Sequence, residues 1–189
     1  LFLSPDRHLD QAREIHASSV VADLHADSFL CVRATGKDIL RRHKPPILWN
    51  PLKLHVDLPR LREGGVSLQV FGLPAVRALG RDFNAQMESQ VRLAEAAVER
   101  ADGALVVVHS PEEAVAAQQA GSVGLAFGLE GCHPLNGDIK EQLAALQARG
   151  LALVGLVHLK ANRYAASTSG RKPKAAGLTD LGHEVISAC

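Results

Sequence analysis

Short apolar runs alternate along the chain with segments whose apolar residues recur at helical spacing. The runs begin near Val20, Val66, Leu105, Ser122 and Leu151, and they are apolar rather than alternating. Strands of a parallel sheet that is covered on its faces have this pattern. The repeated order of strand and helix therefore predicts an α/β fold with a parallel sheet.

The helical segments carry their own boundary signals. Residues typical of a helix N-cap open four of the predicted helices, at Ser4, Ser110, Asp138 and Thr179. Gln86–Ala101 has the clearest helical periodicity, with one apolar face. Residues 33–57 contain three prolines and the only Trp, which predicts a long irregular loop.

Two architectures fit this order of elements: an open doubly wound sheet, or part of a (β/α)8 TIM barrel. The chain contains no GxGxxG after the first strand and no GxxxxGK[ST]. Nucleotide-binding doubly wound folds therefore lose support. The 189 residues are enough for one ordinary domain with a real core, so we expect a single domain over residues 1–189.

Charge and composition exclude several classes of partner. The chain has 21 basic and 20 acidic residues and a net charge of +1, which gives no reason to expect nucleic acid or an anionic membrane as a partner. No apolar run reaches the length of a transmembrane segment, and no signal peptide opens the chain. Three cysteines, Cys31, Cys132 and Cys189, make no disulfide framework. This low, odd count favours a reducing, cytoplasmic compartment.

Acidic and histidine side chains follow three of the predicted strands. His25 and Asp27 come after the first strand, Glu130 closes the strand from Ser122, and His158 closes the strand from Leu151. In parallel α/β folds the carboxyl ends of the strands meet at one rim, where the functional groups lie. We therefore expect these four side chains to lie near one another.

The residue types suit a metal site. Residues two apart on an extended chain point to the same side, so His25 and Asp27 can offer an imidazole nitrogen and a carboxylate oxygen to one point. Zinc and other divalent first-row metals bind such a pair. Glu130 could add a carboxylate that bridges two metals, and His158 could polarise a substrate oxygen.

Each of these residues also has an ordinary structural interpretation. His-x-Asp alone is a weak motif, because polar residues at strand ends often cap a loop. Glu130 could form a buried ion pair, and backbone carbonyls could satisfy His133 and His158. We interpret Cys132 as a small buried residue and Asp23 as a structural one.

Four stretches resemble the membrane dipeptidase (renal dipeptidase) family of zinc metallopeptidases, in the amidohydrolase superfamily. They are VVADLHADSF, HVDLPRLREGGVSLQVF, GLEGCHPL and LVHLKANRYAAS. In the last stretch, His158 and Asn162 are in register with the family's Leu-Thr-His-x-x-x-Asn pattern. The resemblance covers nearly the whole chain in the right order.

The resemblance implies a (β/α)8 barrel of the metal-dependent hydrolase type with two zinc ions at its C-terminal rim. By position, His25 and Asp27 match ligands of the first zinc, and Glu130 matches the carboxylate that bridges both. His158 matches the histidine that binds substrate and helps to stabilise the tetrahedral intermediate. The implied substrate is a dipeptide, and the family is commonly dimeric.

The family's remaining ligands and its catalytic aspartate belong to later strands than this chain contains. We therefore expect residues 1–189 to be a single partial domain, the N-terminal half of the barrel. The leading hypothesis is a zinc dipeptidase. Two alternatives stay open: another amidohydrolase-type hydrolase with a different substrate, and a non-catalytic half-barrel or interaction module.

Overall fold

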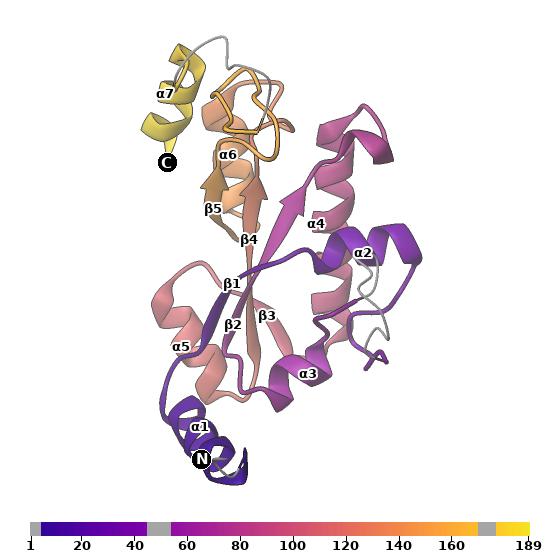
Figure 1. Cartoon of the computed structure of the whole chain (residues 1–189), viewed down its shortest axis with the longest axis vertical. Coiled ribbons are helices and arrows are strands. Elements are labelled where there is room, and N and C mark those ends of the chain that lie inside the picture. Colours follow the sequence, from indigo (N-terminus) through magenta and orange to yellow (C-terminus); the bar gives the residue numbers. More distant parts are fainter. Residues whose placement is uncertain (1–4, 45–53, 170–176) are drawn as a thin grey trace.

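A five-stranded parallel sheet forms the centre of the computed structural model, which describes residues 5–44, 54–169 and 177–189 (Figure 1). Its strands are β1 (Ala22–Ala26), β2 (Leu68–Pro74), β3 (Leu105–Val107), β4 (Val123–Glu130) and β5 (Leu151–Gly155). Every pairing is parallel. The predicted α/β class with a parallel sheet is therefore confirmed.

The pairing does not follow the order of the strands along the chain. β2 pairs with β4 along its whole length, from Leu68 opposite Gly124 to Pro74 opposite Glu130. On its other edge β4 pairs with β3 near its start and with β5 near its end. β3 thus pairs only with the start of β4 and ends short of the carboxyl rim. The strands that reach this rim are β1, β2, β4 and β5.

The described residues form seven α-helices and one short 3-10 helix. They are α1 (Pro5–Ser18), α2 (Ser28–Thr35), α3 (Leu58–Glu63), the 3-10 helix (Arg77–Leu79), α4 (Phe83–Arg100), α5 (Pro111–Gln119), α6 (Ile139–Gln147) and α7 (Asp180–Ala188). α1 precedes the first strand, α7 follows the last, and the others connect the strands. α2 and α4 pack on β2, α5 packs on β4, and α6 lies between β5 and α7. α1 and α7 lie at opposite ends of the long axis (Figure 1). None of the helices described is long and apolar enough to cross a membrane.

The core lies under the two central strands. Phe71 of β2 and Phe127 of β4 are almost completely buried, and Phe29 of α2 meets Phe71 edge to face at a centroid distance of 4.9 Å. The edge strands differ, since Leu24 of β1 is 59% exposed and Leu153 of β5 is 43% exposed. The apolar pattern predicted buried strands throughout, which is correct for the centre of the sheet and wrong for its edges.

Three of the predicted N-caps are confirmed. The side chains of Ser110, Asp138 and Thr179 each accept a hydrogen bond from a backbone N–H three residues later. Such bonds satisfy donors that a helix leaves unpaired at its first turn. The predicted cap at Ser4 lies outside the described residues.

The boundaries of several elements differ from the prediction. The first apolar run begins at Val20, but β1 begins at Ala22 and ends at Ala26, where it still pairs with β2. Helix α2 was not predicted, and it takes residues 33–35 from the expected loop over 33–57, of which 45–53 lie outside the described residues. Asp82 caps α4, so this helix starts three residues before the expected Gln86.

Candidate metal centre

The carboxyl ends of β1 and β4 bring three of the predicted residues to one point. His25 is the second-last residue of β1, Asp27 follows the strand, and Glu130 is the last residue of β4. β2 lies between the two strands and sets their separation. One ligand atom from each of the three side chains lies within 4.8 Å of the other two, and this group is the metal-type cluster found among the described residues.

The distances suit a small divalent metal. His25 Nε2 lies 3.6 Å from Asp27 Oδ1 and 3.8 Å from Glu130 Oε1. Zinc bonds to nitrogen and carboxylate oxygen are about 2.0–2.2 Å long, so ligand atoms of a tetrahedral site lie roughly 3.3–3.6 Å apart. Imidazole nitrogen and carboxylate oxygen are both ordinary zinc ligands. The residues present therefore fit one divalent metal with little rearrangement.

Gly72 of β2 forms the floor of this cluster. A Cβ atom built on Gly72 would lie 2.9 Å from His25 Cε1 and still closer to Asp27 Oδ1. Real Cβ atoms almost never approach other atoms so closely, so only glycine leaves room for the two side chains in this arrangement. No sequence signal points to Gly72, because a glycine inside an apolar strand gives no sign of which side chains lie against it.

Local hydrogen bonding leaves Asp27 available. Asp27 occupies the N-cap position of α2, yet its side chain makes no capping hydrogen bond. Asp23, in contrast, accepts a hydrogen bond of 2.9 Å from the backbone N–H of His25. The two aspartates thus differ as expected: Asp23 supports the backbone of the strand, and Asp27 points into the cluster.

Glu130 is the most buried of the three cluster residues. Its side chain is 22% exposed, compared with 56% for His25 and 43% for Asp27. Its Oε2 atom is buried without a hydrogen-bond partner in the described structure. Burial and the nearby Asp27 carboxylate raise the pKa of Glu130, and this is partly offset by His158 and His25. A buried carboxylate oxygen that lacks a hydrogen-bond partner and lies beside a second carboxylate is typical of a metal or ligand site.

His158 joins the cluster from a loop after β5. Its Nε2 lies 3.1 Å from Glu130 Oε1, and its side chain is 24% exposed. The predicted strand extended to Val157, but β5 ends at Gly155. His158 therefore reaches the rim through an irregular turn and does not follow the strand directly.

His133 and Cys132 lie behind these residues. His133 Nδ1 is buried without a described partner, which differs from the expected carbonyl contact. Burial and His158 lower the pKa of this imidazole. Cys132 is fully buried, as expected, and burial together with Cys189 raises the pKa of its thiol to about 11.

Two cavities open beside the cluster. The first, of about 230 Å³, has His25 and Asp27 on one wall and Leu54, His55 and Val56 on the other. The second, of about 420 Å³, extends from His25 and Glu130 along the exposed faces of β1 and β5. His55, which falls in the loop predicted over residues 33–57, lies on a wall of the first cavity.

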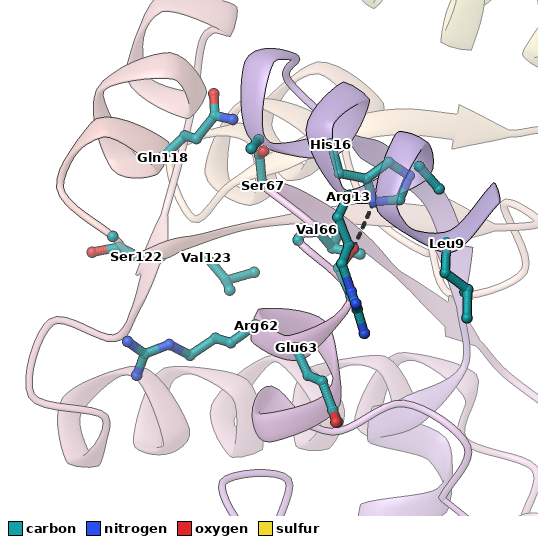
Figure 2. A pocket seen from close by; sticks show the side chains of 15 residues that line it. Leu9, Arg13, His16, Arg62, Glu63, Val66, Ser67, Gln118, Ser122 and Val123 are labelled. Atoms are coloured by element: carbon teal, nitrogen blue, oxygen red, sulfur yellow. Dashed lines mark hydrogen bonds between the residues drawn. The ribbon is translucent and has the colours of Figure 1, made fainter. Parts of the chain in front are cut away.

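A larger cleft, of about 670 Å³, lies at the opposite end of the strands, under α1. Figure 2 shows its mixed lining, with Arg13 and His16 from α1 above and Arg62 and Glu63 from α3 below. His16 Nδ1 lies 2.7 Å from the carbonyl oxygen of Gly64. This lining contains no group of residues with metal-ligand geometry among those described. The rim cluster is therefore the better candidate for chemistry, although its cavities are smaller.

Solved structures with this fold include several peptidases. The probable dipeptidase PvdM from Pseudomonas aeruginosa superposes with a TM-score of 0.78 at 18% identity, covering 97% of this chain and 47% of its own. The dipeptidase AC, a family M19 metallopeptidase, superposes with a TM-score of 0.72 at 19% identity, and the match covers 90% of this chain and 53% of the dipeptidase. A Rhodobacter sphaeroides metallopeptidase, liganded with a phosphinate mimic of L-Ala-D-Ala, superposes with a TM-score of 0.70 at 18% identity. The match covers 90% of this chain and 55% of the metallopeptidase.

These likenesses establish the fold, and they show that the chain spans about half the length of the solved structures it matches. A search of the curated proteins gives no significant match. The sequence itself matches the family model of the membrane dipeptidases, peptidase family M19, over residues 9–189. The chain therefore belongs to the membrane dipeptidase family.

Proposed function

We propose that this chain carries the first-metal side of a zinc dipeptidase centre. The observation that carries the proposal is the approach of His25, Asp27 and Glu130 within 4.8 Å at the carboxyl rim of a parallel sheet. The expected complement is two zinc ions, with His25 and Asp27 on one and Glu130 shared by both. The unpartnered Glu130 Oε2 supports a shared carboxylate, because it leaves a second ligand atom without another contact.

Zinc bound by these residues would supply an acidified water and polarisation of a carbonyl group. The protein's own part is to fix the three ligands on rigid strands and to limit the access of bulk water to Glu130. His158 would donate a hydrogen bond from Nε2 to the carbonyl oxygen of the substrate, where negative charge develops during hydrolysis. Its present contact with Glu130 places this imidazole next to the cluster.

The proposed substrate is a dipeptide. Family membership supports this class, and so does the relative whose ligand mimics L-Ala-D-Ala. The cavities of about 230 and 420 Å³ on either side of His25 offer room for the two residues of such a ligand. A homodimer and a cytoplasmic location stay predictions from the resemblance and from cysteine usage.

Zinc titration of the purified chain tests the proposal. We expect the chain to bind zinc tightly by calorimetry, and we expect chelator-sensitive release of Ala from L-Ala-D-Ala only where the later strands of the barrel are also present. Zinc binding without turnover would support the ligand assignment and restrict this chain to half of the catalytic centre. A chain that binds no zinc and shows no turnover would favour the alternative of a non-catalytic half-barrel.

A further inference from the structure

The turn that carries His158 has an unusual backbone. The N–H of Lys160 donates to the carbonyl oxygen of His158 at 2.6 Å, which closes a three-residue turn around Leu159. Leu159 has φ +59°, one of two positive φ values among the described non-glycine residues. Residues other than glycine rarely adopt this region, and holding one there costs on the order of 1–3 kcal/mol.

Packing of Leu159 does not offset this cost. The residue is 64% exposed, so its side chain gains little from burial in the described structure. A strained turn persists only when its surroundings hold it in place. Contacts made by the flanking residues must therefore maintain the conformation that directs His158 toward Glu130.

Asn162 makes four of those contacts, in addition to the hydrogen bond of 3.2 Å that the Ser167 hydroxyl donates to the Leu159 carbonyl oxygen. Its Nδ2 donates to the carbonyl oxygen of Leu156 at 2.7 Å. Its Oδ1 accepts from the backbone N–H groups of Tyr164 and Ala165, at 2.8 and 3.1 Å. Its own N–H donates to the carbonyl oxygen of Ala165 at 3.1 Å. One side chain thus ties the start of the His158 loop to its end.

The same contacts reach the Glu130 loop. The carbonyl oxygen of Leu156 also accepts from the N–H of Cys132 at 3.1 Å, two residues after Glu130. Leu156 therefore receives one hydrogen bond from each of the two loops that present Glu130 and His158. Both bonds fix the orientation of the same carbonyl group, so loss of the Asn162 donor lets this carbonyl turn away from the Cys132 N–H.

We propose that Asn162 is a positioning residue, which holds the strained turn at Leu159 and thereby keeps the His158 imidazole beside Glu130. The functional meaning of this position rests on the proposed role of His158 in substrate binding. The positioning itself depends only on contacts within the described chain. It can therefore be tested without metal or substrate.

The test is NMR of the metal-free chain with ¹³C-labelled histidine, in which His158→Gln identifies the His158 ring signal. We expect Asn162→Ala to move that signal to the position of a free imidazole and to leave the signals of His16 and His109 unchanged. The Cys132 amide should exchange with solvent roughly tenfold faster. Asn136→Ala is the matched control, because Asn136 is an exposed loop residue that also accepts a side-chain hydrogen bond, and it should change neither readout.

A rescue experiment separates positioning from general destabilisation. Glycine adopts positive φ freely, so Leu159→Gly in the Asn162→Ala background should restore the His158 signal. If Asn162→Ala does not fold, Asn162→Asp keeps the acceptor for Tyr164 and Ala165 and replaces the donor to Leu156 by a carboxylate oxygen, which the Leu156 carbonyl repels. It should then shift the His158 signal and speed Cys132 exchange.

An unchanged His158 signal in Asn162→Ala, or in Asn162→Asp where the alanine variant is unfolded, would overturn the proposal. A double variant that shows no rescue would overturn it as well. Absence of dipeptide turnover would bear on the proposed function and leave these results unaffected.

Discussion

The two ends of the parallel sheet differ in the volume of their cavities and in whether their polar groups have hydrogen-bond partners. The cleft at the amino end is the larger, about 670 Å³, and its polar groups find partners nearby. His16 contacts the Gly64 carbonyl, Gln118 donates to the Ser19 carbonyl, and Ser122 donates to the Gly103 carbonyl. The carboxyl end has smaller cavities, yet it holds the buried, unpartnered Glu130 Oε2.

This difference shows that the volume of a cavity alone does not identify the functional site in an α/β fold. Polar groups at the amino end are used to attach α1 and to close turns, which lowers their reactivity. At the carboxyl end the side chains pair only in part, because Glu130 Oε2 stays buried without a hydrogen-bond partner in the described structure, and folding tolerates this cost. Variants in matched pairs, one from each region or from adjacent strands, can sharpen this comparison.

Removal of the shared carboxylate should have the largest effect. Glu130→Gln replaces an anionic ligand by a neutral amide, so we expect zinc affinity to fall by at least about 100-fold in calorimetric titration. Glu63→Gln, which removes a carboxylate from the lining of the amino-end cleft, should leave zinc affinity unchanged. Equal losses in both variants would mean that the rim cluster is not the zinc site.

Filling the floor of the cluster should have the next largest effect. Gly72→Ala places a methyl group against His25 and Asp27, so we expect zinc affinity to fall roughly tenfold because the ligands must move. Gly128 lies directly opposite Gly72 on β4, and a Cβ there would meet Val70 at an ordinary 3.4 Å. Gly128→Ala should bind zinc like the natural chain. Similar losses in the two variants would show that bulk anywhere on the central strands disturbs binding.

The pH dependence of stability tests the cost attributed to Glu130. Its pKa is raised in the folded chain, so folding favours the protonated carboxyl. Metal-free chain should therefore lose free energy of unfolding, relative to Glu130→Gln, as pH rises from the ordinary value of 4.5 through the raised pKa. Urea unfolding in chelator across this range measures the difference. A difference that is constant with pH would contradict the raised pKa.

The smallest effect is expected at the amino end. His16→Ala removes the contact with the Gly64 carbonyl, which should lower the free energy of unfolding by about 1 kcal/mol. Zinc affinity should stay unchanged, because α1 and the rim lie at opposite ends of the strands (Figure 1). Thermal denaturation and zinc titration of the same sample measure both. Reduced zinc binding in this variant would show that the two ends are coupled.

Much of this organisation was predictable from the sequence. Apolar runs and helix caps predicted the α/β class, and polar residues at strand ends selected His25, Asp27, Glu130 and His158, which the structure brings together. These predictions succeed because strand direction and side-chain alternation are local properties. Their roles as metal ligands and substrate contact remain predictions for the experiments above.

Features that depend on distant contacts were missed. Gly72 matters only because the side chains of His25 and Asp27, from the end of the neighbouring strand, lie against it. The role of Asn162 depends on the carbonyl of Leu156, which also accepts from the Glu130 loop. The exposure of β1 and β5 is likewise a consequence of their places at the sheet edges. No periodicity within a single segment can report such relations.

The pairing of β2 with β4 also has a consequence for the order of folding. These strands form the longest ladder of the sheet, yet α4, β3 and α5 all lie between them in sequence. Contacts between such distant segments form slowly, because a long loop must close first. His25 and Glu130 should therefore come together only in the last stage of folding. Bound zinc would then stabilise contacts that are absent from the folding transition state, so it would slow unfolding far more than it speeds folding.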